Sequence, residues 1–308
     1  MGLPDEYVEL AKKLNNWGRW GPDDQRGTLN FITPEAVVRA AQLVKVGKAI
    51  SLALPMSDRG PQTGALKGRI NPIKTMVAIN EPLSQDPDGA AMSDDLLIVS
   101  PQGSTHWDAL AHVSRDGLLY NGFSASQITT DGAHKLGIHK TGPIVGRGIL
   151  LDVARAAGVD RLTGGHALTG QDLDAAATWG GIKPAPGDIV LVRTGHIQLL
   201  HQGDRDGYLF TSPGLSMKTA EWFYDHQVAA VATDTIALEV YPCERDDLMF
   251  PVHMLHLVEM GLTQGQNFDL EELGRDCADD RVYEFFFEGT PEPIVRGLGS
   301  FVNPIAVK

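Results

Sequence analysis

The strongest candidates for chemistry in this sequence are His106, Asp108 and His112, which fall within one short stretch. If residues 102–108 are extended, alternate side chains share a face, so His106 and Asp108 point the same way. If Asp108 then opens a helical turn, His112 lies over it at i+4. Imidazole and carboxylate groups together are a common ligand set for a catalytic zinc or manganese ion. The spacing therefore predicts a concave polar cluster that can hold a divalent metal.

The same alternation assigns expected places to the neighbouring residues. Gln102 and Ser104 would share the face of the candidate ligands, where Ser104 could donate a hydrogen bond to a substrate oxygen. Trp107 would point the other way, and we expect it to pack in the core rather than on a substrate. A nucleophilic Ser104 assisted by His112 and Asp108 is disfavoured, because no Gly-x-Ser-x-Gly turn surrounds the serine.

This stretch resembles the signature of the metal-dependent cyclase family, which includes bacterial kynurenine formamidases and isatin hydrolases. The signature reads His-x-Gly-Thr-His-x-Asp-x-Pro-x-His, and four residues match it: Thr105, His106, Asp108 and His112. Gln102 stands where the family has its first histidine. The resemblance implies that His106 and Asp108 bind the metal and that His112 is the acid/base, whereas Gln102 inherits only a position.

A second segment resembles a later part of the family pattern. His253 precedes Gly261 by about two helical turns, as a family histidine does. The glutamate that follows in the family falls on Gln266. His256 would share a helical face with His253, and a buried core histidine is an equally good interpretation of it. We expect Glu259 to be a solvent-exposed helix residue.

Two neutral amides, Gln102 and Gln266, replace ionisable groups of the family pattern. An amide oxygen carries no net charge, so the exchange should weaken metal affinity and leave a bound cation more electrophilic. Gln266 cannot accept a proton at ordinary pH, which places more of the proton transfer on His112. Two interpretations stay open. Either zinc or manganese is held by His106, Asp108 and a third ligand such as Gln102 or water, or the metal is lost and the pocket uses its histidines alone or only binds a ligand.

The composition is that of an ordinary globular protein, with 308 residues, 43% hydrophobic and 21% charged. A formal net charge of −13 without a basic stripe argues against nucleic acid or an anionic membrane as a partner. Cys243 and Cys277 show no metal-ligand spacing and are too few for a disulfide framework. Because we find neither a signal peptide nor a membrane-spanning run, we expect a cytoplasmic protein.

Short apolar segments alternate with helical patterns along the chain, which predicts an α/β fold with a mixed central sheet. Helices are expected over 4–14, 33–46, 169–179 and 216–226, and strands over 50–54, 75–79, 96–99, 148–153, 188–193 and 228–233. Residues 57–73 are predicted to form an exposed loop that borders a pocket. We expect one domain, residues 1–308, with residues 1–32 as an N-terminal packing arm. The resemblance implies, more specifically, a swivelling β/β/α cyclase-like fold assembled as a homodimer or higher homo-oligomer.

These observations together predict a metal-dependent hydrolase acting on a small carbonyl compound. A metal-activated water would open or cleave the C–N or C–O bond of an amide, imide or lactone, with His112 moving the proton. Four further residues are expected in or just behind the substrate pocket: Ser104, Trp107, His253 and Gln266. The competing hypotheses are a degenerate cyclase-fold binding protein, a metal-free enzyme, and a buried hydrogen-bond network at 106–112 without catalytic function.

Overall fold

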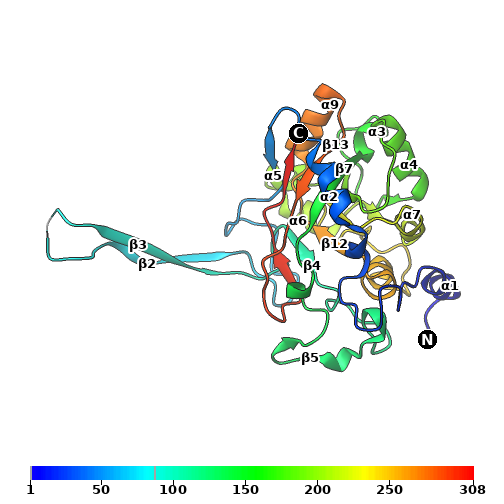
Figure 1. The fold of residues 1–308 in the computed structure, drawn as a ribbon, viewed down its shortest axis with the longest axis horizontal. Helices are drawn as coiled ribbons and strands as arrows, with labels where there is room; N and C mark the ends of the chain where they lie inside the picture. The colour runs from blue at the N-terminus through cyan, green and yellow to red at the C-terminus, as the bar shows by residue number, and fades with distance from the viewer. Residues whose placement is uncertain (1, 87) are drawn as a thin grey trace.

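A nine-stranded mixed sheet forms the centre of the computed structural model, which describes residues 2–86 and 88–308 (Figure 1). Its strands lie in the order β1-β15-β13-β7-β9-β11-β12-β4-β14. In chain order they are β1 (Ala49–Ser51), β4 (His106–Asp108), β7 (Val145–Asp152), β9 (Ile189–Arg193), β11 (Ala230–Thr233), β12 (Thr263–Gln266), β13 (Glu284–Glu288), β14 (Gly299–Phe301) and β15 (Ile305–Val307). The four central strands β7, β9, β11 and β12 are parallel, and the outer pairs are antiparallel. The predicted α/β fold with a mixed sheet is confirmed.

Helices pack on this sheet and close its ends. The α-helices are α1 (Asp5–Lys13), α2 (Pro34–Ala41), α3 (Val153–Ala156), α4 (Gly170–Trp179), α5 (Gln198–His201), α6 (Arg205–Phe210), α7 (Thr219–Asp225), α8 (Pro251–His253) and α9 (Glu271–Asp280). The 3-10 helices are η1 (Gly27–Phe31), η2 (Tyr120–Gly122), η3 (Ala125–Gln127) and η4 (Ile138–Lys140), and a π-helix, η5 (Met254–Met260), continues α8. Small two-stranded sheets join β8 (Ala167–Leu168) to β10 (Gly214–Leu215) and β5 (Ile128–Thr129) to β6 (Gly132–Ala133). In the described part of the chain, every helix is too short or too polar to cross a membrane.

The central parallel strands β9 and β11 are buried on both faces, as their mostly apolar sequences require. Alternate residues of β9 separate into two cores, because successive side chains of a strand point to opposite faces. Val190 and Val192 lie in a core with residues of α1, α4 and α7, whereas Ile189 and Leu191 lie in a core with Trp107 and residues of α9. The sheet is thus a rigid layer between two apolar cores.

Several predicted elements are confirmed with small shifts of their ends. The helices expected over 4–14 and 169–179 are α1 and α4, and Thr169 and Asp172 form the capping box of α4. The strands expected over 148–153, 188–193 and 228–233 are β7, β9 and β11. Of the strand expected over 50–54, only β1 and an isolated bridge at Ala53 are present.

The helix predicted over 33–46 is shorter than expected. Thr33 caps it, as predicted, by accepting a hydrogen bond from Ala36, but the helix ends at Ala41. The N–H groups of residues 46–48 all donate to the carbonyl of Lys308 instead. This segment therefore satisfies its backbone by a long-range contact, which local helical pattern cannot reveal.

The helix predicted to follow Ser216 begins two residues later than expected, at Thr219. The carbonyl of Ser216 accepts hydrogen bonds from both the backbone N–H and the hydroxyl of Thr219. The serine therefore closes a turn that precedes α7.

The N-terminal segment closes the end of the π-helix η5. The last carbonyls of a helix have no partner within the helix. Here the carbonyls of residues 258–261 accept hydrogen bonds from the N-terminal segment. The Trp17 indole N–H donates to residue 258, and the Asn16 backbone N–H donates to residue 259. The Asn16 side-chain amide donates to residue 260, and the Thr28 backbone N–H donates to residue 261. Residues 16–28 thus hold the helix that begins with α8.

A long hairpin of β2 (Ile73–Pro82) and β3 (Ala91–Ile98) projects away from the body (Figure 1). Nearly every described residue of the two strands is exposed. In the described part of the chain, each strand pairs only with the other. The strands predicted over 75–79 and 96–99 are therefore confirmed, but they belong to this hairpin, not to the central sheet.

Candidate active site

Strand β4 places the central residues of the site. It lies between β12 and β14, with His106 opposite Gln266 and Asp108 opposite Gly299. His106 and Asp108 share one face of the strand, as predicted. Trp107 points to the other face and packs edge-on against Phe268 and Phe287 in the core, where its indole N–H donates to a backbone carbonyl. The expectation that Trp107 belongs to the core is confirmed.

The predicted shared face does not extend back to Gln102 and Ser104, so that part of the prediction is wrong. Residues 101–105 form turns and bends, and Gly103 donates its N–H to the carbonyl of Ser100 at 2.7 Å. A turn removes the alternation of an extended chain. The Gln102 amide lies against Gly299, and Ser104 lines a separate cavity near Thr105 and Asn303.

His112 reaches the site through a tight turn rather than through a helix. Its backbone N–H donates to the carbonyl of Ala109 at 2.8 Å. The turn places His112 Nε2 3.8 Å from Asp108 Oδ1, which is the i+4 proximity that the spacing predicted. The ring is 21% exposed, whereas the side chains of His106 and Asp108 are each 1% exposed. Of these three groups, His112 is therefore the most accessible from the pocket.

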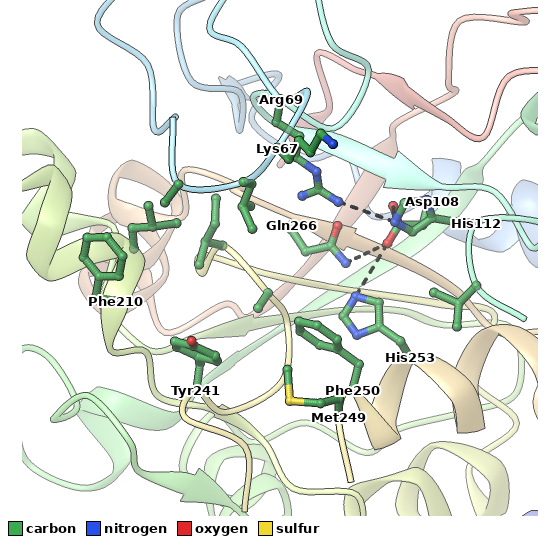
Figure 2. A pocket seen from close by; sticks show the side chains of 16 residues that line it. Lys67, Arg69, Asp108, His112, Phe210, Tyr241, Met249, Phe250, His253 and Gln266 are labelled. Carbon is green, nitrogen blue, oxygen red and sulfur yellow. Dashed lines mark hydrogen bonds and ion pairs between the residues drawn. The ribbon is translucent and has the colours of Figure 1, made fainter. Parts of the chain in front are cut away.

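Three imidazoles surround the buried carboxylate of Asp108. Figure 2 shows two of them, those of His112 and His253. His106 Nε2 lies 3.5 Å and His112 Nε2 3.8 Å from Asp108 Oδ1. His253, at the end of α8, approaches from the opposite side and places Nε2 3.9 Å from Asp108 Oδ2. The structure thus brings together four residues that the sequence offered as candidates from segments almost 150 positions apart.

The partners of the second ring nitrogens fix the orientation of two of these histidines. His106 Nδ1 lies 2.7 Å from the carbonyl of Ser104, so it must carry the proton that it donates. His253 Nδ1 contacts the carboxylate of Glu239 and must likewise be a donor. Glu239 also accepts the backbone N–H groups of Val252 and His253. In the neutral form of either histidine, the Nε2 lone pair therefore faces Asp108.

Two side-chain amides from β12 donate to the second carboxylate oxygen of Asp108, Oδ2. Gln266 Nε2 donates to Asp108 Oδ2 at 2.9 Å, and Gln264 Nε2 donates to the same oxygen at 3.2 Å. The amide oxygens of both glutamines and Asp108 Oδ1 are buried and have no hydrogen-bond partner among the residues that the structure describes. Both glutamines thus contact Asp108 directly, and each of the three side chains keeps one acceptor oxygen unpaired among the described residues.

This donor set fits a cation. The described residues contain no group of three or more His, Cys, Asp or Glu side chains already placed as a metal site. Asp108 Oδ1 and His106 Nε2 are nevertheless two buried acceptors that face each other with no donor between them. Their separation of 3.5 Å is close to the ~3.4 Å between two ligand atoms of a tetrahedral zinc with ~2.1 Å bonds. Buried acceptors of this kind are costly unless a proton or a cation pairs them.

The charges at the site follow from burial and from the ring of imidazoles. Burial alone would raise the pKa of Asp108, but His112, His106 and His253 together hold that pKa well below its usual value. Burial lowers the pKa of His112, although Asp108 opposes the shift. Burial would also lower the pKa of His253, but its hydrogen bond to Glu239 raises the pKa overall. The site therefore combines an ionised carboxylate with a neutral His112 near pH 7.

A pocket of about 480 Å³ opens in front of Asp108 and His112 (Figure 2). This volume is within the range of small-molecule sites. Its apolar lining comes from Ala65, Leu66, Val113, Leu209, Phe210, Ile236, Ala237, Met249 and Phe250, and its polar lining from Lys67, Arg69, Asp108, His112, Tyr241, His253 and Gln266. The loop predicted to border a pocket supplies Lys67 and Arg69, which confirms that prediction.

Arg69 contacts the candidate base. Its Nη2 lies 3.5 Å from His112 Nε2. A guanidinium has only donors, so this contact also requires an unprotonated Nε2 on His112. Sequence reasoning did not single out Arg69, Glu239, Gln264 or Tyr241. Only Gln264 had a local signal, since it lies two residues before Gln266 on one strand and therefore shares its face.

Two residues near His253 belong to the interior. His256 is fully buried, packs edge-on against Phe223 and has a pKa lowered by burial to about 3, which favours the core interpretation. The prediction that Glu259 is solvent-exposed is wrong. Its carboxylate is buried and accepts hydrogen bonds from Arg115 and Asn15, because the N-terminal segment folds over this helix.

Comparisons with known proteins identify the family. Residues 32–240, more than half of the chain, match a family model described as "Putative cyclase". A solved structure described as a novel cyclase is 39% identical, with a TM-score of 0.88 over 96% of this chain and 100% of its own. No curated protein sequence matches.

More distant structures share the fold. Isatin hydrolase A from Ralstonia solanacearum is 18% identical, with a TM-score of 0.61 over 84% of this chain and 91% of its own. A structure described as a potential metal-dependent hydrolase with cyclase activity is 15% identical, with a TM-score of 0.54 over 84% of this chain and 96% of its own. The family model and the 39% identical structure show that the chain belongs to the cyclase family of enzymes.

Proposed function

We propose that this enzyme is a metal-dependent hydrolase that cleaves the C–N or C–O bond next to a carbonyl in an amide, imide or lactone. The observation that carries the proposal is the buried, unpaired Oδ1 of Asp108, which lies between the Nε2 atoms of His106 and His112 at the wall of the pocket. The fold that the chain shares with isatin hydrolases and with structures described as metal-dependent hydrolases supports it.

His106 and Asp108 are the proposed ligands, and an imidazole with a carboxylate suits Zn²⁺ or Mn²⁺. The hydrogen bond from His106 Nδ1 to the Ser104 carbonyl orients the ring and makes Nε2 the better donor atom. Gln102, which lies against Gly299, and a water molecule remain the candidates for a further ligand. When bound, the metal would acidify a water molecule and polarise the substrate carbonyl.

His112 is the proposed general base. Its Nε2 takes a proton from the attacking water, whose oxygen forms the new bond to the carbonyl carbon. The bond from that carbon to the leaving nitrogen or oxygen breaks, and His112 returns the proton to the leaving atom. A neutral His112 beside ionised Asp108 is ready for this role, because burial keeps its pKa below the ordinary value.

Arg69 is proposed to stabilise the negative charge that develops on the substrate oxygen. Its guanidinium reaches within 3.5 Å of His112 Nε2 and lines the same pocket. A fixed cation stabilises developing negative charge more strongly in a partly dehydrated pocket than in water. The apolar remainder of the lining suits a compact, largely apolar substrate body.

The alternatives of a binding protein or a metal-free enzyme draw on the two glutamines. Gln266, however, donates to Asp108 Oδ2 and so leaves Oδ1 to a cation, which favours a working site.

The test is elemental analysis of protein purified without a tag or added metal, followed by a screen of amides, imides and lactones. About one zinc or manganese per chain, together with turnover that a chelator abolishes, supports the proposal. Turnover in protein that neither contains nor takes up metal overturns it.

A further inference from the structure

Two cations, Lys67 and Arg69, lie on one wall of the pocket. Figure 2 shows them on the side opposite the rings of Tyr241 and Phe250. Among the described residues of the lining, Asp108 is the only acid, and imidazoles and amides already contact its carboxylate. This wall is therefore locally positive in a chain whose formal net charge is −13.

Neither cation has an acid as its partner in the part of the chain that the structure describes. Elsewhere in the molecule, Arg147 and Lys218 each pair with an acid. Arg69 already has a proposed role at the substrate carbonyl oxygen, because its guanidinium reaches His112. The ammonium group of Lys67 lines the same pocket and has no role in the proposed chemistry.

The loop that carries Lys67 is attached to the body on both sides of this residue. Before it, the Gln62 side-chain amide donates to the carbonyl of Gly103 at 3.2 Å. After it, the Ile70 N–H donates to the hydroxyl of Ser100 at 3.1 Å. Gly103 permits this close packing, because a Cβ there would lie 2.7 Å from the Ile70 carbonyl oxygen. The place of Lys67 on the wall is thus set before a ligand binds, which lowers the entropy cost of binding.

A neutral substrate would leave this wall with an electrostatic cost. A largely apolar body that fills the pocket displaces water from both cations, and removing water from a charge costs free energy unless an opposite charge replaces it. The negative charge that develops on the substrate carbonyl oxygen compensates Arg69. An ammonium group has only donors, so Lys67 needs a further acceptor, and a carboxylate supplies one with a single negative charge.

We propose that the substrate carries a carboxylate group remote from the bond that breaks, and that Lys67 binds this group. The inference rests on the proposed hydrolase function, because it names the substrate class of the same pocket: an amide, imide or lactone with an additional carboxylate. Lys67 precedes Arg69 by two residues, so the bound carboxylate would lie along the wall that also holds the reacting carbonyl. Tyr241 and Phe250 would face the apolar body of the substrate from the opposite side.

The first test measures binding without turnover. Isothermal titration calorimetry on the enzyme as purified compares the dicarboxylates glutarate, adipate and isophthalate with butyrate, pentanoate and benzoate, which lack one of the two carboxylates. At least one dicarboxylate should bind about 10-fold more tightly than its monocarboxylate, as expected for one hydrogen bond between charged groups. Lys67→Gln should abolish this preference, and Lys67→Arg should retain it.

Reversal of the charge gives a test that a merely structural lysine would not pass. Lys67→Glu should bind δ-aminovalerate, in which an ammonium group replaces one carboxylate of adipate, more tightly than pentanoate. Lys45→Glu is the matched control, because Lys45 is exposed, lies outside the pocket lining and alters the net charge by the same amount. This control should keep the wild-type preference for the dicarboxylate.

Kinetics separate a failure of this inference from a failure of the hydrolase proposal. With a carboxylate-bearing substrate, Lys67→Gln should raise KM about 10-fold, and the effect should fall on KM rather than on kcat, since the ammonium group does not contact the reacting atoms. A dicarboxylate preference that is lost in Lys67→Gln supports the inference even where the screen finds no hydrolysis. Equal affinity of the wild type for the dicarboxylates and their monocarboxylates overturns it, as does a preference that Lys67→Gln leaves intact. Turnover of neutral amides or lactones would then still support the hydrolase proposal.

Discussion

His106 donates its Nδ1 proton to the carbonyl of Ser104, two residues earlier, at 2.7 Å. This contact leaves Nε2 as the free nitrogen of the neutral ring and directs it at Asp108 Oδ1. A turn at residues 101–105 thus prepares a donor atom on the strand that follows.

Changing Asp108 to Asn should remove the metal. The amide keeps the size of the side chain but loses the charge that makes Oδ1 a strong ligand. Metal content by elemental analysis should fall to background, while far-UV circular dichroism stays unchanged. His134→Ala is the matched control, because His134 is exposed and its ring makes a hydrogen bond to Thr129. Full metal content in Asp108→Asn would show that the cation binds elsewhere.

Changing His112 to Ala should slow turnover about 100-fold or more, as expected for the loss of a general base. The metal content should stay at the wild-type level, since His106 and Asp108 are the proposed ligands. Steady-state kinetics and elemental analysis on the same preparation separate the two roles. Loss of metal in this variant would make His112 a ligand rather than the base.

Changing Arg69 to Gln should lower kcat about 100-fold, with a smaller effect on KM, if the guanidinium acts on charge that develops during the reaction. Lys67→Gln is the matched control, since Lys67 lines the same wall and has no proposed contact with the reacting atoms. Kinetics on both variants with the best substrate from the screen measure the effect. Equal losses of kcat in the two variants would mean that Arg69 contributes only general positive charge and no specific contact with the reacting atoms.

The fold should lose stability as the pH falls below about 6.5, partly because of His256. Burial lowers the pKa of His256 in the folded protein to about 3, whereas in the unfolded chain it keeps a value near 6.5. Between these values the unfolded state binds a proton that the folded state does not, so stability is lost as the pH decreases. At pH 5 this amounts to about 2 kcal/mol.

Urea unfolding of the wild type and of His256→Gln at pH 7 and pH 5 measures this contribution. The variant should lose about 2 kcal/mol less than the wild type between the two pH values. Equal losses would mean that His256 does not titrate differently in the folded and unfolded states.

The core of the site was predictable because its geometry is local. The spacing of His106, Asp108 and His112 is short enough for strand alternation and one turn to determine which side chains meet. Local reasoning failed two residues earlier, since the turn at Gly103 moved Gln102 and Ser104 off the shared face. Alternation holds only while the chain stays extended.

The other contacts depend on tertiary structure. Glu239 meets His253, and Arg69 meets His112, only after separate segments have packed together. Glu259 was predicted to be exposed from its place on a helix, but Arg115 and the N-terminal segment bury it. The strands of the hairpin were predictable from their apolar β-branched residues. Its projection from the body was not, because β2 and β3 pair with each other and not with the described strands of the central sheet.

The bonds from Asn16 and Trp17 to the end of η5 connect residues 241 to 244 positions apart. During synthesis, these two bonds cannot form until the chain has been made as far as Met260. Contacts of such high sequence separation are slow to form, because the chain loses the entropy of closing a long loop before the contact stabilises it. The helix that carries His253 should therefore be fixed in place only late in folding, when its contacts with the N-terminal segment have formed.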